Sequence, residues 1–306
     1  MTKKGIPIFI YSVAAVLACG VIRFFLYLTA IDFRTGFYTP EGAPAGLFFR
    51  ALTLAAAVGF AVLCFVGERR RWTAFTVASD GMGARATLAL GLFYLAAAAV
   101  MLFSMVRAGL SILSLAAAIG FAAVALMMLK NSAAPAVAGL LQVALSLLLF
   151  FKTIEIFNAD LVIGNRSDSL LLLLSYVFGA LFFASSARCY ARIETKHSRL
   201  RELILAGLTL LFSGAGLFAK LLSALFGGAK TLGVPAPDPT AAALLLISLG
   251  FIASLCFTEQ KKAIVYLVTE VEEKKAKKQK KKADRSADTD GENREALPQS
   301  EVGESN

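Results

Sequence analysis

The chain has 306 residues, of which 58% are hydrophobic and 17% are charged, and its mean hydropathy is +0.70. Polar surface could not cover so much apolar side chain in water, so the composition excludes an ordinary soluble domain and favours a membrane protein. The formal net charge of +10 could suggest a nucleic-acid partner, but the basic residues lie mostly in alternate loops, which has a different explanation.

Apolar stretches of about 18 to 25 residues recur along the chain, and each is long enough to cross roughly 30 Å of hydrocarbon as a helix. They lack the alternating pattern of outer-membrane β-barrel strands. The sequence therefore predicts an all-α integral membrane protein with about eight transmembrane helices. The predicted spans, in chain order, are 7–30, 47–66, 86–106, 109–129, 134–157, 169–187, 203–226 and 240–257.

With eight spans, most basic residues fall on one side of the membrane. That side holds Lys3, Lys4, Arg69, Arg70, Arg71, Arg85, Lys130, the loop 188–202 and the Lys-rich tail. The other side holds only Arg34, Arg50, Arg107, Arg166 and Lys230 near the membrane. The positive-inside rule then predicts a bacterial cytoplasmic membrane protein with both termini in the cytoplasm, and no nucleic-acid partner is expected.

The stretch AIDFRTGFYTPEG, which joins the first two spans, places an acid, a base and two aromatic residues between apolar runs. Asp32 opens the segment DFRTG, and Asp160, at the matching end of the fifth span, opens DLVIG at an offset of 128 residues. This offset predicts two tandem four-helix units, residues 1–128 and 129–258, in the same orientation. A simpler interpretation is that each acid closes a turn and each glycine allows a positive φ.

Three cations lie inside apolar runs: Arg23 in the first span, Lys152 in the fifth and Lys220 in the seventh. Each lies about five to seven residues, or roughly 8 to 11 Å along a helix, from the predicted outer end. A charge in hydrocarbon costs several kcal/mol unless it is paired or hydrated, so each cation needs a partner or water.

Two hypotheses account for these cations. In the first, they reach the outer headgroups or form structural pairs, Lys152 with Glu155 one helical turn away and Arg23 and Lys152 with Asp32 and Asp160. In the second, they line an outward-open polar cavity that holds a carboxylate, a phosphate or a lipid headgroup, with Arg50 or Arg107 at its rim and Gln142 at its floor. The candidate ligand-binding residues are Arg23, Asp32, Lys152, Glu155, Asp160 and Lys220.

Catalysis is not favoured, because the sequence shows no GxSxG, HExxH or Walker motif and no paired metal ligands. No cofactor or metal is expected. The seventh span contains Gly207, Gly214 and Gly216, which either break the helix or allow neighbouring helices to approach closely.

The C-terminal segment divides into residues 259–283, which combine a short amphipathic pattern with a polybasic run, and an acidic tail, 284–306, that is expected to be disordered. The polybasic run either binds anionic lipid or is a solvated tail that helps to set orientation. Its lysines are Lys274, Lys275, Lys277, Lys278, Lys280, Lys281 and Lys282.

Two functions remain open at this point. The first is a multi-pass membrane protein that binds or transports an anionic or amphiphilic solute or lipid through an outward-facing polar site. The second is a non-catalytic structural or regulatory membrane subunit whose charges pair internally and which docks an unknown cytoplasmic partner. A polar cavity at the outer face favours the first, and an outer face filled by apolar side chains favours the second.

Overall fold

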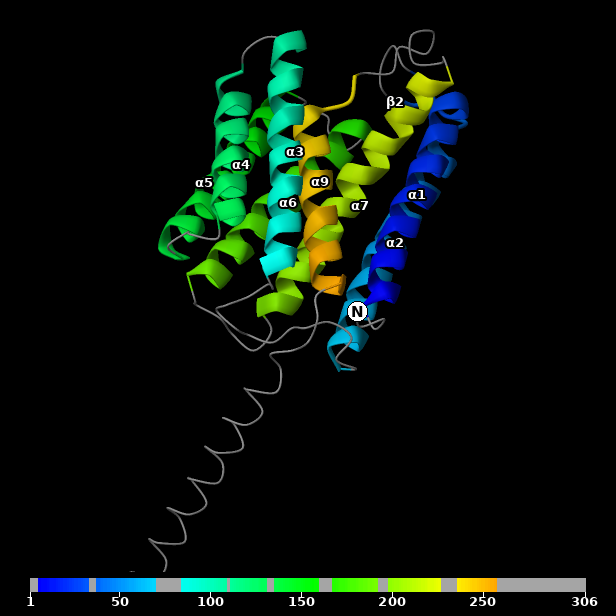
Figure 1. Ribbon diagram of the computed structural model, residues 1–306. Coiled ribbons are helices and arrows are strands. Elements are labelled where there is room, and N and C mark those ends of the chain that lie inside the picture. Colours follow the sequence, from blue (N-terminus) through cyan, green and yellow to red (C-terminus); the bar gives the residue numbers. More distant parts are fainter. Residues whose placement is uncertain are drawn as a thin grey trace, which may run out of the picture. The chain divides into compact units, whose positions relative to one another are not determined.

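The computed structural model describes residues 5–32, 37–69, 84–108, 111–130, 135–159, 167–191, 198–226 and 236–257. Within these ranges lie eight helices that are long and apolar enough to cross a membrane, which confirms the predicted all-α multi-pass membrane protein (Figure 1). The elements are α1 (Ile6–Thr29), β1 (Ile31–Asp32), β2 (Phe37–Tyr38), α2 (Ala43–Arg69), α3 (Ala84–Ala108), α4 (Ile112–Lys130), α5 (Pro135–Ala159), α6 (Ser167–Tyr190), α7 (Ser198–Leu225) and α9 (Pro239–Phe257).

Several helices begin where the sequence provides a start signal. Proline opens α5 and α9, where its missing N–H costs nothing because the first helical N–H groups have no partner within the helix. Asp238 precedes α9, and its Oδ1 accepts a hydrogen bond of 2.9 Å from the N–H of Ala241, as an N-cap residue does. These local signals fix where the chain enters the bundle.

The short strands β1 and β2 form an antiparallel hairpin between α1 and α2, with Ile31 opposite Tyr38 and Asp32 opposite Phe37. We call this the hairpin end of the bundle. Because the helices alternate in direction, α6 and α9 begin and α7 ends at the hairpin end (Figure 1). At the opposite end, a Cβ built on Gly5 would lie 2.8 Å from the backbone of Cys256, so α1 begins where α9 finishes.

Helix α7 lies at the centre, packed against α1, α2, α6 and α9. In its most apolar window 67% of the residues are buried, compared with 22% for α5 at the periphery. The outer faces of the peripheral helices instead carry exposed large apolar side chains such as Phe48, Phe103 and Phe157, as contact with lipid requires. The central position of α7 lets it carry polar residues that would be costly in contact with lipid.

The proposed division into residues 1–128 and 129–258 stays a prediction. In this division, the pair α1–α2 corresponds to α5–α6, and the pair α3–α4 corresponds to α7–α9. In each of the four pairs the two helices pack against each other. However, α6 also packs extensively on α7, whereas their counterparts α2 and α3 do not do so along the described residues. Residues 1–259 group as one compact unit, and the segments 259–283 and 284–306 lie outside the described residues.

The glycines of α7 do not break it, since the helix runs without interruption from Ser198 to Leu225. A Cβ on Gly207 would lie 1.9 Å from Cε1 of Phe60, and one on Gly214 would lie 2.5 Å from Cγ1 of Val16. Close helix approach is therefore confirmed at these two positions. Gly216 differs, because nothing lies within 4 Å of its Cβ position.

This contrast predicts opposite effects of adding one methyl group. Gly207→Ala forces Phe60 and α2 away from α7, and we expect it to lower the free energy of unfolding by about 1 to 3 kcal/mol. Gly216→Ala is the matched control and should leave stability unchanged or raise it by up to about 1 kcal/mol, through the higher helix propensity of alanine. Thermal unfolding of both variants in detergent measures the difference, and equal melting temperatures would contradict this account of α7 packing.

Candidate functional site

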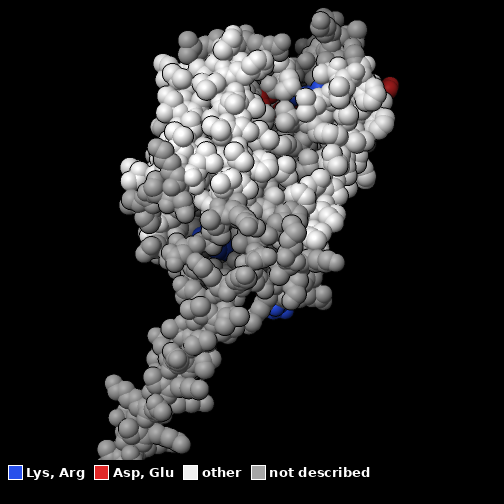
Figure 2. Space-filling view, viewed as in Figure 1, with Lys and Arg blue, Asp and Glu red and all other residues white. Residues whose placement is uncertain are grey.

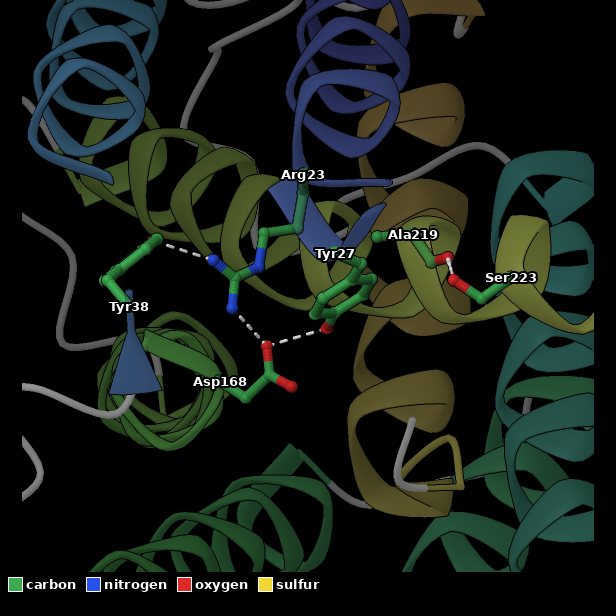
Figure 3. A network of polar contacts seen from close by, with 6 residues as sticks. All are labelled: Arg23, Tyr27, Tyr38, Asp168, Ala219 and Ser223. Atoms are coloured by element: carbon green, nitrogen blue, oxygen red, sulfur yellow. Dashed lines mark hydrogen bonds and ion pairs between the residues drawn. The ribbon is translucent and has the colours of Figure 1, made fainter. Parts of the chain in front are cut away.

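Arg23 lies fully buried in α1, with 0% of its surface exposed. Its Nη2 donates a hydrogen bond of 2.5 Å to Oδ1 of Asp168 in α6, with which it forms an ion pair. Its Nη1 donates a hydrogen bond of 2.8 Å to the hydroxyl of Tyr38 in β2. One guanidinium thereby joins two helices and the hairpin (Figure 3).

Aromatic rings surround the same guanidinium. Its central carbon lies 4.9 Å from the ring centre of Tyr27, 5.5 Å from that of Phe49 and 5.9 Å from that of Tyr38. The negative face of an aromatic ring attracts a cation, so these rings compensate part of the lost hydration. The ion pair and the rings together explain how arginine is tolerated in an apolar helix.

Asp168 uses a single oxygen for its described contacts. Oδ1 accepts the bond from Arg23 and a second hydrogen bond of 2.7 Å from the hydroxyl of Tyr27. Oδ2 takes part in no hydrogen bond or ion pair that joins described residues, and Figure 3 shows it clear of the network. One oxygen of Asp168 thus remains available beside the ion pair.

The hairpin holds Tyr38 in place. The N–H of Thr39 donates a hydrogen bond of 2.9 Å to the carbonyl of Ala30, and the N–H of Gly42 donates one of 2.9 Å to the carbonyl of Thr39. These two bonds fold the chain back onto α1. A Cβ on Gly46 would lie 2.6 Å from the Tyr38 ring, so only glycine lets the ring lie against α2. The segment between the first two spans therefore positions a partner for Arg23.

A small recess lies next to this network at the hairpin end, between α6, α7 and the start of α9, with an accessible volume of about 20 Å³. That volume accommodates about one water molecule. Figure 2 shows acidic and basic atoms together in a hollow at the upper end of the bundle, whereas its visible flank is largely uncharged. The lining residues are Asp168, Leu171, Leu172, Ser175, Phe212, Ser213, Gly216, Leu217, Lys220, Asp238 and Ala241.

The polar groups of the recess are only partly satisfied. The ammonium of Lys220 has no hydrogen bond or ion pair with any described residue, although it lies within electrostatic range of Asp168. Oδ1 of Asp238 accepts bonds from Ala241 and from the hydroxyl of Tyr176 at 2.7 Å, and its Oδ2 takes part in no contact between described residues. The recess therefore combines a partly exposed ammonium with two available carboxylate oxygens.

The opposite end of the bundle holds a polar cluster of another kind. Glu202 is 1% exposed. Its carboxylate accepts a hydrogen bond of 2.5 Å from the hydroxyl of Ser186 and one of 2.8 Å from Nη1 of Arg199. Each of its oxygens has a partner among the described residues. This arrangement is sufficient as a structural pair.

Of the predicted site residues, the structure brings Arg23 and Lys220 together around Asp168. Asp32 lies in β1 at the same end. Lys152 is partly buried on α5 and Glu155 is exposed; neither lines the recess, and no ion pair joins these two described residues. Asp160 lies outside the described residues.

The expectation for Gln142 was wrong. Gln142 is buried in α5, and its Nε2 lies 3.2 Å from the hydroxyl of Tyr94 in α3, away from the residues that line the recess. Of the two predicted rim residues, Arg50 lies at the hairpin end with its guanidinium carbon 6.0 Å from the Tyr38 ring centre. The side chain of Arg107 lies outside the described residues.

Sequence reasoning missed Asp168 and Asp238, the two acids of the recess. Asp238 had a usable signal, because an Asp-Pro pair before an apolar run is a typical helix start. Asp168 had a weaker one, an acid directly before the predicted span 169–187. Pairing acids with cations by proximity in sequence pointed to Asp32 and Asp160, whereas Asp168 is 145 positions from Arg23.

No protein-family model, curated protein or solved structure matches this chain. Among the described residues, no group of three histidine, cysteine, aspartate or glutamate side chains could hold a metal ion. The charged residues that line the recess are Lys220, Asp168 and Asp238.

The buried pair predicts strongly non-additive mutations. Arg23→Leu leaves Asp168 without its cation, and Asp168→Leu leaves Arg23 without its anion, so each should cost about 3 to 5 kcal/mol of stability. The double variant should cost clearly less than the two single losses combined, because it leaves no unpaired charge. Thermal unfolding of the four proteins in detergent measures this coupling.

Lys152→Leu is the matched control, since it removes a cation at similar depth that has no described ion pair. It should change stability by less than about 1 kcal/mol. Additive losses for Arg23 and Asp168, or an equal loss for Lys152→Leu, would contradict the assignment of the pair as a structural anchor.

Proposed function

We propose that this protein binds or transports an amphiphilic or anionic solute or lipid through the recess at the hairpin end. The observation that carries the proposal is Lys220, a residue that lines the recess and whose ammonium has no hydrogen bond or ion pair with any described residue. The Arg23 guanidinium is held by a carboxylate and a hydroxyl, and the Glu202 carboxylate is held by a guanidinium and a hydroxyl. An ammonium left available in an apolar helix is a cost that a bound anionic group would repay.

The walls of the recess suit an amphiphile. Leu171, Phe212 and Leu217 supply apolar surface close to Lys220. A phosphate or carboxylate on Lys220 would place an attached apolar chain along these side chains. Because the recess holds about one water molecule, only part of a headgroup enters it without a movement of the surrounding helices.

We also propose that the hairpin end faces the outside of a bacterial cytoplasmic membrane and that both termini are cytoplasmic. This orientation rests on the positive-inside rule, because Arg69, Arg188 and Arg201 lie at the helix ends opposite the hairpin and the other basic loops adjoin those ends in the sequence. The lysines from Lys274 to Lys282 would then lie at the inner leaflet, where each could contribute about 1 kcal/mol of attraction to anionic lipid.

The alternative function is a structural or regulatory membrane subunit that docks a cytoplasmic partner. The Arg23–Asp168 network favours it, because Arg23 already has a carboxylate and a hydroxyl partner within the protein and so needs no ligand. In that case the Lys220 side chain extends toward water or lipid headgroups at the surface. Replacing Lys220 would then alter the local charge and leave ligand binding unaffected.

Orientation can be tested by labelling single cysteines. In a variant whose native residues Cys19, Cys64, Cys189 and Cys256 are replaced by alanine, we expect Glu41→Cys, at an exposed turn of the hairpin end, to react with a membrane-impermeant thiol reagent added outside intact cells. Arg69→Cys, at the end of α2, is the control and should react only after the cells are opened. The reverse pattern would show that the hairpin end faces the cytoplasm.

Ligand binding can be tested with dodecyl phosphate, an amphiphile with a small anionic headgroup, added to protein in a non-ionic detergent. A ligand that binds only the folded state at 100 times its Kd stabilises that state by about 2.7 kcal/mol, so the melting temperature should rise with its concentration. Lys220→Gln should abolish this rise, and Lys152→Gln should retain it. An equal rise in both variants would favour the structural alternative.

A further inference from the structure

We infer that the ligand of the recess is a zwitterion, in which a primary ammonium accompanies the anionic group that binds Lys220. This inference rests on the proposed function and names its ligand class. It follows from three properties of the recess: its balance of charge, its excess of hydrogen-bond acceptors and its size.

The charges at the site cancel. Arg23 and Lys220 contribute two positive charges, and Asp168 and Asp238 contribute two negative charges, within one network and the recess beside it. A ligand that carried only negative charge would meet Lys220 favourably and the two carboxylates unfavourably. A ligand with both charges matches the site better, because its ammonium gives Asp238 a cationic partner in addition to the one that Arg23 gives Asp168.

Acceptors outnumber donors in the recess. The hydroxyl of Ser175 donates its proton to the carbonyl of Leu172 at 2.7 Å, and that of Ser213 donates to the carbonyl of Thr209 at 2.6 Å. Both serine side chains are buried, with 0% and 2% of their surface exposed, so neither hydroxyl supplies a donor to a ligand. The lining residues therefore offer two carboxylate oxygen atoms, Oδ2 of Asp168 and Oδ2 of Asp238, against one donor atom, the ammonium nitrogen of Lys220.

A primary ammonium fits this set in both chemistry and size. It is a compact group with three N–H donors and no acceptor, and it is close to a water molecule in volume. The accessible volume of about 20 Å³ admits a group of that size. A quaternary ammonium has the same charge but no N–H to donate, and its three methyl groups make it larger than a water molecule.

Asp238 offers a selective way to test the inference, because its two oxygens have separate roles. Oδ1 caps α9 and accepts the Tyr176 hydroxyl, and Oδ2 takes part in no contact between described residues. Asp238→Asn keeps an acceptor oxygen for the cap, since asparagine is as good an N-cap residue as aspartate, and it removes the charge. The fold should survive this variant.

The experiment compares three amphiphiles with the same dodecyl chain and a phosphoethanolamine, a phosphocholine or a phosphate headgroup. Each is titrated into purified protein in a non-ionic detergent, and the shift in melting temperature gives the apparent affinity. We expect phosphoethanolamine to bind about tenfold more tightly than the other two, because its ammonium adds a charge-assisted hydrogen bond to a carboxylate of the recess. In Asp238→Asn this preference should disappear, while binding of the phosphate compound is retained.

The outcomes separate the inference from the proposed function. Equal affinity for all three headgroups, with loss of binding in Lys220→Gln, would overturn the zwitterion and leave the anionic site standing. Unchanged binding of all three compounds in Lys220→Gln would overturn both. A preference for phosphoethanolamine that persists in Asp238→Asn would overturn the assignment of Asp238 as the group that binds the ammonium.

A fourth titration, with soluble phosphoethanolamine that has no chain, distinguishes the two sources of this chemistry. Competition at similar concentration supports a free zwitterionic solute as the ligand. A lack of competition, together with a preference among the chain-bearing compounds, supports the headgroup of a membrane lipid.

Discussion

The structure of the hairpin end depends on one constraint, the burial of a guanidinium that cannot lose its charge. Arginine keeps its proton at any accessible pH, so Arg23 cannot lower the cost of burial by becoming neutral, as a lysine could. Its two outer nitrogens reach in different directions, one to Asp168 and one to Tyr38. This divergence is what ties α6 and the hairpin to α1.

The same constraint explains the short strands between α1 and α2. A flexible connection of this length would bring Tyr38 near Arg23 only part of the time. The hairpin removes that freedom by pairing Ile31 with Tyr38, and Gly46 allows the ring to lie directly on α2. The loop thus has a structural role, which answers why so apolar a chain places polar and aromatic residues there.

The sequence was sufficient for the spans, their number and the presence of three unusual cations. These features depend on composition over windows of about 20 residues, where the physics of the bilayer leaves few alternatives. It was not sufficient for the partners of the cations. Several acids lie near the predicted outer side, and the choice among them is made by helix packing, which brings α6 to the end of α1 across 145 positions of chain. The prediction that Gln142 forms the floor of the cavity failed for the same reason, since its depth in α5 did not reveal that it contacts Tyr94 in α3.

The contrast between the two ends of the bundle supports treating the recess as a site. At the Glu202 end, both carboxylate oxygens have partners among the described residues, as expected where polar groups serve only the fold. At the hairpin end, the Arg23 pair already secures the fold, yet Lys220 and one oxygen each of Asp168 and Asp238 remain available beside it. Alanine would fit at Gly216 with no contact within 4 Å, so the space near these groups is not required by the packing of α7. Groups that the fold does not use, next to space that the fold does not fill, are the physical basis for assigning a ligand there.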